Sequence, residues 1–255
     1  MVMPDVQGPL INIDVCFVYK MIALMPFTSA ILCISFAVLL HFDEVTKTHC
    51  KVPNYLPSIS AATGDYSPEK YIWRIGIAYH SFMRLIGVIL EHRILHNRII
   101  GTPSTCFVWM TRIKSLLLVV ENFALLMLTY VSSDDNYSVH EKSFILFMVA
   151  GMIHMLLCCF LRYKSSKSPK SHEETKSFQR KVTLVGVNYG SFACAVYFFI
   201  RHNWYCEPGV YSLFALCEYI VVISNILFHC TIVDDLKGFK LLIGHVVPPT
   251  ATKYN

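Results

Sequence analysis

Six apolar stretches constrain the fold of this chain more than any other feature of its sequence. A helix of about 20 residues spans the roughly 30 Å hydrocarbon core of a bilayer. Inside lipid each segment must satisfy its own backbone polar groups, and segments of this length do so as helices, because barrel strands need only about 10 residues. The sequence therefore predicts an all-α, polytopic membrane bundle of six transmembrane helices, at residues 21–40, 71–90, 113–131, 143–161, 182–200 and 210–230.

The composition supports the same fold class. Hydrophobic residues make up 55% of the chain and charged residues only 15%, with a mean hydropathy of +0.49. Six such helices use nearly all of the sequence. The longest loops, 41–70 and 162–181, are too short and too polar to hold a second hydrophobic core. We therefore expect a single membrane domain over residues 1–255.

The distribution of Lys and Arg predicts the orientation of the bundle. The loops after the second and fourth helices hold eleven of these residues, whereas the loops after the first, third and fifth hold five. Because cytosolic loops carry the excess of positive charge, both termini and the even loops should be cytosolic and the odd loops lumenal. The net charge of +5 is then explained by the basic cytosolic loops, and we expect no nucleic-acid partner.

Two cysteines stand apart from the other eight. Cys50 and Cys206 are the only ones in the predicted lumenal loops, where an oxidising compartment allows a disulfide. Such a bond would tie the first lumenal loop to the last. The sequence has no CxxC pair and no His–Cys cluster at zinc spacing, so we expect no metal site.

Several predicted helices carry ionisable residues. Placing a charged side chain inside a bilayer costs free energy, so such residues usually have a structural or functional role. Counting from the lumenal helix ends places His80 and Glu218 at a similar depth, about 12 to 14 Å below the boundary. We expect them to share one polar site. A second, deeper cluster is expected towards the cytosolic half, from Arg84, Glu121, His154 and His229. The alternative is that these groups are buried ion pairs that only fix helix register.

The predicted lumenal segment 201–207 concentrates polar and aromatic side chains at the membrane surface. Arg201, His202, Asn203 and Tyr205 would suit a phosphate or sugar headgroup. A solvated turn with interfacial aromatic anchors explains the same residues. His140, which precedes Glu141 near a predicted helix start, is as easily part of a helix cap. Motifs of soluble enzymes such as GxSxG, HExxH or a phosphate-binding Gly-rich loop do not occur.

Several long strings in the sequence resemble the post-GPI-attachment-to-proteins factor 2 family. They are THCKVPNYLPS at 48–58, VVEN at 119–122, LTYVSS at 128–133 and RHNWYCE at 201–207. The similarity runs from about residue 20 to residue 243. It weakens in the first 20 residues, in the basic loop at 162–181 and in the tail.

The resemblance implies a multi-pass protein of the Golgi membrane, with the endoplasmic reticulum as the alternative location. It implies a role in the lipid remodelling of GPI-anchored proteins, namely reacylation of the lyso-GPI intermediate at sn-2 with a saturated fatty acid. GPI-anchored proteins, their anchors and membrane lipids would be the partners. No cofactor is expected, and an acyl donor such as acyl-CoA or a phospholipid would be the co-substrate.

The resemblance leaves open whether the chain is itself the acyltransferase. As an enzyme, it would use His80 or His202 as general base with Glu218 to orient or tune it, while Arg74 and Arg201 hold the phosphoinositol group. As a non-catalytic factor, it would use the same residues to bind or present the lyso-anchor. A channel or transporter is a third possibility, but no broken helices in repeated halves are visible.

Overall fold

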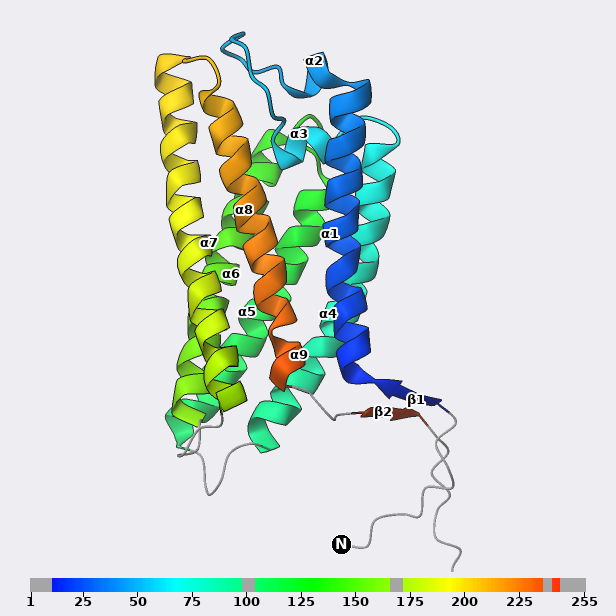
Figure 1. Cartoon of the computed structure of the whole chain (residues 1–255), viewed down its shortest axis with the longest axis vertical. Coiled ribbons are helices and arrows are strands. Elements are labelled where there is room, and N and C mark those ends of the chain that lie inside the picture. The colour runs from blue at the N-terminus through cyan, green and yellow to red at the C-terminus, as the bar shows by residue number, and fades with distance from the viewer. Residues whose placement is uncertain (1–10, 98–103, 166–171, 236–239, 244–255) are drawn as a thin grey trace, which may run out of the picture.

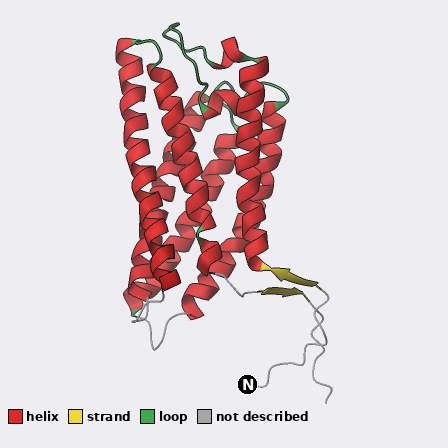
Figure 2. Ribbon diagram, viewed as in Figure 1, coloured by secondary structure: helices red, strands yellow, loops and turns green. Residues whose placement is uncertain are grey.

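The computed structural model describes residues 11–97, 104–165, 172–235 and 240–243. Its long helices form an elongated bundle (Figure 1), and helix dominates the described residues (Figure 2). The six long helices are α1 (Val15–Leu40), α4 (Glu69–Asn97), α5 (Thr105–Tyr130), α6 (Tyr137–Ser165), α7 (His172–Tyr205) and α8 (Val210–Cys230). The short elements are α2 (Phe42–Val45), α3 (Ile59–Thr63), α9 (Ile232–Asp235), β1 (Ile11–Asp14) and β2 (Lys240–Ile243).

All long helices except α8 extend beyond the apolar stretches that predicted them. Hydropathy marks only the part of a helix that fits in hydrocarbon, whereas capping residues set the actual ends. Asp14 caps α1 by accepting a hydrogen bond from the Cys16 N–H at 2.8 Å, and Ser104 caps α5 by accepting one from the Phe107 N–H at 3.3 Å. The predicted loop 162–181 is likewise helical at both ends, and its centre, 166–171, lies outside the described residues.

The structure adds one short element to the predicted helical bundle. Strands β1 and β2 pair in antiparallel register, with Ile11 opposite Ile243 and Asp14 opposite Lys240. Four-residue strands are too short to give a periodic signal in the sequence. They pair here because segments near the two ends of the chain lie at the same end of the bundle. This small sheet lies beside the base of α1 (Figure 1).

The long helices alternate in direction, so both described chain ends lie at the same end of the bundle (Figure 1). We call this the terminal end. The opposite end carries α2, α3 and the connection between α7 and α8, and we call it the disulfide end, after the Cys50–Cys206 bond described below.

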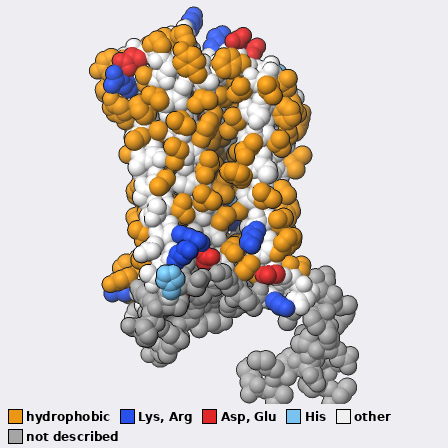
Figure 3. Space-filling model, in the orientation of Figure 1, with side chains coloured by type: hydrophobic (Ala, Val, Ile, Leu, Met, Phe, Trp, Pro, Cys, Tyr) orange, Lys and Arg blue, Asp and Glu red, His pale blue; other side chains and the backbone are white. Residues whose placement is uncertain are grey.

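Five of the long helices, α1, α5, α6, α7 and α8, are long and apolar enough to cross a membrane. Helix α4 falls outside this set because Arg74, His80, Arg84 and Glu91 interrupt its apolar sequence. Large hydrophobic side chains cover much of the face of the bundle seen in Figure 3. The exposed hydrophobic residues include Leu39, which is 77% exposed, and Ile75, which is 72% exposed. An apolar exterior around buried polar residues is the arrangement expected of a multi-pass membrane protein.

Small residues let helices α1 and α4 approach closely. A Cβ atom added to Gly76 of α4 would lie 2.0 Å from the Ser29 hydroxyl oxygen and 2.9 Å from its Cβ on α1. Close contact of small residues is a principal source of helix association in lipid. This contact helps to fix the position of α4, which carries His80 and Arg84 into the interior.

Candidate functional site

A partly open cavity of about 80 Å3 lies among α1 and α3–α8. Most of its wall is apolar, with side chains that include Pro26, Ile77, Leu125, Phe147, Phe192 and Val222. The polar groups on the wall are Ser60, His80, Arg84, Glu218 and Asn225. Their positions along the helices place Ser60 towards the disulfide end and Arg84 with Asn225 towards the terminal end. The cavity therefore combines a long apolar wall with polar groups at both ends.

His80 and Glu218 both line this cavity, but each is bonded to backbone. The Nδ1 atom of His80 lies 3.0 Å from the Ile22 carbonyl oxygen. A carbonyl only accepts, so Nδ1 carries the proton and Nε2 is left as an acceptor. Glu218 Oε2 accepts a hydrogen bond from the Ile59 N–H at 3.1 Å. Within the described residues no bond joins His80 to Glu218, so direct tuning of the imidazole by this carboxyl is not seen.

Helix α8 holds the segment that leads into α3 at successive points. The Ser212 hydroxyl accepts hydrogen bonds from the N–H groups of Tyr55, at 2.7 Å, and Leu56, at 3.3 Å. The Tyr219 hydroxyl donates to the Pro57 carbonyl, and Glu218 accepts from Ile59. These bonds fix the backbone immediately before Ser60.

Ser60 forms a pair with His140 that the sequence did not reveal. The Ser60 hydroxyl lies 2.9 Å from Nε2 of His140, and Nδ1 of that ring lies 2.8 Å from the Val131 carbonyl oxygen. Because the carbonyl requires the proton on Nδ1, Nε2 must accept the proton of the Ser60 hydroxyl. The two residues are 80 positions apart, and no spacing rule joins them. His140 drew attention only through its neighbour Glu141, as part of a cap.

The deeper cluster of Arg84, Glu121, His154 and His229 is present, and we call it the buried ion cluster. Glu121 is fully buried, and its Oε2 atom lies 2.8 Å from Nη2 of Arg84. The same Nη2 donates to Nε2 of His229 at 2.6 Å, while Asn225 donates to Glu121 Oε1 at 3.1 Å. The His154 and His229 rings stack with centroids 5.3 Å apart. The buried carboxylate of Glu121 is thus surrounded by polar side chains from three other helices, α4, α6 and α8.

Glu121, His154 and His229 have ligand atoms close enough together to hold a metal ion. The guanidinium of Arg84 argues against that role because it already neutralises Glu121 and uses the Nε2 lone pair of His229. A divalent cation would have to displace this permanent positive charge. The buried ion cluster is better described as an ion pair with hydrogen-bonded neighbours.

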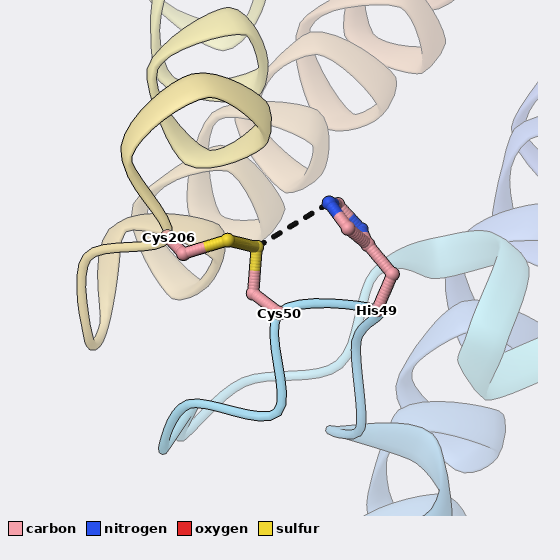
Figure 4. A group of neighbouring side chains, drawn as sticks. All are labelled: His49, Cys50 and Cys206. Carbon is pink, nitrogen blue, oxygen red and sulfur yellow. Dashed lines mark hydrogen bonds between the residues drawn. A yellow bond between two sulfur atoms is a disulfide. The ribbon is translucent and has the colours of Figure 1, made fainter.

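The disulfide end carries the other predicted residues. Cys50 and Cys206 form a disulfide with Cα atoms 5.3 Å apart, and Nε2 of His49 lies 3.3 Å from the Cys50 sulfur (Figure 4). His202 is fully buried beneath this bond, where Nε2 lies 3.1 Å from the Thr48 hydroxyl. His202 is not among the residues that line the cavity. His80 thus lies on the wall of the cavity, whereas His202 does not.

The predicted headgroup-binding residues spread over the surface of the disulfide end. Arg201 forms a two-point contact with Glu207, at 2.6 and 3.0 Å, and these bonds lower the pKa of the Glu207 carboxyl. Asn203 and Tyr205 are exposed on the last turn of α7. Arg74 lies over the Tyr130 ring, 5.8 Å from its centroid. Because Arg201 is already paired with Glu207, it would have to release that carboxylate to bind a phosphate.

Comparison with known proteins gives consistent matches. Residues 15–239 match the family described as "Frag1/DRAM/Sfk1/Cwh43P N-terminal domain". The chain is 39% identical over 225 residues to "Post-GPI attachment to proteins factor 2" of Caenorhabditis elegans, which covers 86% of this chain and 84% of that protein. It is 41% identical over 222 residues to "Acyltransferase PGAP2" of Xenopus tropicalis, with 86% of each chain covered. No solved structure matches the chain.

Proposed function

The chain belongs to the post-GPI attachment to proteins factor 2 family, and from that premise we propose that it takes part in remodelling the lipid of GPI-anchored proteins. The proposed reaction is acyl transfer. A saturated fatty acyl group from a lipid or thioester donor is joined to the sn-2 hydroxyl of the lyso-anchor in the lumenal leaflet. We further propose that the protein acts in the Golgi membrane.

The observation that carries this proposal is the cavity itself. Its apolar wall provides a dry environment for a fatty acyl chain, and polar groups stand where an ester or hydroxyl could be held. Acyl transfer requires a base, and in His80 the Nε2 atom is left free to accept a proton. Among the bases predicted from sequence, we therefore retain His80 and not His202, which lies apart from the cavity.

One observation favours the second candidate function, a non-catalytic factor that binds the lyso-anchor for another enzyme. His80, Glu218 and His202 each hold a different part of the fold together, through Ile22, Ile59 and Thr48 respectively. Side chains occupied in this way could shape a binding cavity without taking part in chemistry.

Reconstitution separates the two functions. The purified full-length chain is placed in liposomes with a lyso-anchored protein and a labelled saturated acyl donor. Formation of diacyl anchor in proportion to the amount of protein supports acyl transfer. Saturable binding of the lyso-anchor with no diacyl product contradicts acyl transfer and supports the binding factor. Liposomes without the protein correct for spontaneous transfer.

A further inference from the structure

We propose that Ser60 is the acyl-accepting nucleophile of this protein and that His140 is its general base, an assignment that rests on the acyl-transfer function proposed above. The pair has the geometry of an activated serine, with the hydroxyl 2.9 Å from an imidazole nitrogen that a second bond holds in the correct tautomer. Here the Val131 carbonyl takes the orienting place that a carboxylate often takes in hydrolases.

The position of Ser60 suits an acyl group. Its side chain lines the cavity, so an acyl group attached to the Ser60 oxygen would begin beside the apolar wall. Both Ser60 and His140 are also partly exposed, which gives a hydroxyl substrate access to them. An apolar acyl pocket and an accessible serine–histidine pair thus meet at one point.

The surroundings hold this serine in place. Glu218 accepts a hydrogen bond from the N–H of Ile59, the residue immediately before Ser60. The Ser58 hydroxyl accepts from the Ala61 N–H at 3.2 Å and caps α3. Glu218 is therefore a positioning residue, which holds the backbone at Ile59, next to Ser60, and does not act on the substrate.

The depth of each histidine along the bundle favours His140 over His80 as the base that takes the proton of the acceptor hydroxyl. The sn-2 hydroxyl of a lysolipid lies at the boundary between headgroup and acyl chain. His140 is three residues from the start of α6 at the disulfide end, whereas His80 is eleven residues into α4, or roughly 16 Å along its axis. A lysolipid in its normal position in the leaflet could reach the first site without being drawn into the bundle.

The reaction balances with these two side chains alone. The Ser60 oxygen attacks the acyl carbon of an ester or thioester donor while its proton passes to Nε2 of His140. The bond from the acyl carbon to the donor oxygen or sulfur breaks, and His140 gives the proton to this leaving group. The lyso-anchor hydroxyl then gives its proton to His140, attacks the acyl-Ser60 ester, and receives the acyl group while the proton returns to Ser60.

The test is to trap the acyl-enzyme. Purified full-length protein in liposomes is incubated without acceptor, in one arm with labelled palmitoyl-CoA and in the other with labelled dipalmitoyl phosphatidylcholine, and the modified peptide is identified by mass spectrometry. We expect the label on Ser60 in the arm that holds the true donor. Addition of lyso-anchored protein should remove the label and form diacyl anchor.

Four variants refine the test. Ser60→Ala and His140→Ala should each lower transfer at least about 100-fold and abolish labelling. Ser60→Cys should instead form a thioester that neutral hydroxylamine cleaves. The matched control is Ser138→Ala, which removes an exposed hydroxyl two residues from His140 and should transfer at the wild-type rate. Thermal unfolding of each variant in detergent checks that it is folded.

Each other outcome is decisive. If Ser60→Ala transfers as fast as the wild type, the nucleophile is wrong while the proposed function stands. If Ser60→Ala loses transfer but the wild type carries no label in either arm, the covalent step is wrong and Ser60 only binds substrate. If the wild type transfers from neither donor, both the acyl-transfer function and this assignment are overturned.

Discussion

At the scale of single residues, two histidines share one arrangement with a chemical consequence. His80 and His140 both place Nδ1 on a backbone carbonyl, that of Ile22 and that of Val131. The carbonyl fixes the proton on Nδ1 and leaves Nε2 as a base. In His140 that base meets the Ser60 hydroxyl. The chemistry available to each imidazole therefore depends on its hydrogen-bond partners, although both residues are histidines.

Glu218 gives the first prediction. A Gln side chain can still accept the hydrogen bond from Ile59, whereas Leu cannot. We expect Glu218→Gln to keep transfer within about threefold of wild type and Glu218→Leu to lose about tenfold or more, since the loss of one positioning hydrogen bond is worth about 1.4 kcal/mol or more. The measurement is the initial rate in liposomes at equal protein content. Equal, severe loss in both variants would show that the carboxyl itself takes part.

The buried ion cluster gives the second prediction. Arg84→Met leaves the fully buried Glu121 without its cation, which should cost about 3 to 5 kcal/mol of stability. Thermal unfolding in detergent and the amount of protein in membranes both report this loss. The control is the double variant Arg84→Met/Glu121→Gln, in which the unpaired charge is gone and much of the stability should return. A single variant as stable as wild type would mean that the pair does not hold the helices together.

At the scale of elements, close helix contacts decide where the polar side chains lie. Helix α4 reaches the interior because Gly76 allows it to approach Ser29 on α1. Helix α8 plays a second role, because its hydroxyl and carboxyl groups hold the backbone before α3 in place. The short helix α3 is thus positioned by tertiary contacts rather than by its own length.

The third prediction compares two glycines. Gly76→Ala puts a Cβ atom 2.9 Å from the Cβ of Ser29, so the helices must separate, and we expect a loss of about 1 to 3 kcal/mol. A Cβ at Gly186 meets no atom within 4 Å. Gly186→Ala should therefore leave stability unchanged or raise it slightly through helix propensity. Unfolding midpoints of both variants in the same detergent test this, and equal midpoints would contradict the close contact of α1 and α4.

At the scale of the whole molecule, the alternating direction of the six long helices determines which groups lie at each end of the bundle. The Ser60–His140 pair and the disulfide lie at one end, and the chain ends and the start of α5 lie at the other. The excess of Lys and Arg in the loops of the terminal end predicts that this end faces the cytosol. The disulfide is in keeping with an oxidising compartment at the opposite end.

The fourth prediction tests this orientation. Cys106 is an exposed free thiol near the first residue of α5, and Ser138 is exposed near the first residue of α6, at the opposite end. In sealed membrane vesicles whose cytosolic face is outward, an impermeant thiol reagent should label Cys106 from outside. Ser138→Cys in a Cys106→Ser background should be labelled only after the membrane is permeabilised. The reverse pattern would place the Ser60–His140 pair in the wrong leaflet and undo the functional argument.

The sequence by itself determined the class of this fold and much of its layout. An apolar stretch of about 20 residues satisfies its backbone hydrogen bonds in lipid by forming a helix. The positions of these stretches in the sequence therefore predicted the positions of the helices. The deeper group of Arg84, Glu121, His154 and His229 was also foreseeable, because a charge inside a bilayer must find a partner on a neighbouring helix. Cys50 and Cys206 could be singled out because they are the only cysteines in the loops that the charge distribution predicts to be lumenal.

Only the tertiary structure decided which polar groups meet. Matched depth placed His80 and Glu218 along the same cavity, but depth does not fix the rotation of a helix about its axis. Each side chain is hydrogen-bonded to a backbone group instead of to the other. Ser60 lies in α3 and His140 near the start of α6, with no common sequence motif. They meet because α3 is held by α8 while His140 is held by Val131. Hydrogen bonds act over about 3 Å, whereas hydropathy and charge counts locate a residue only to within a helix turn.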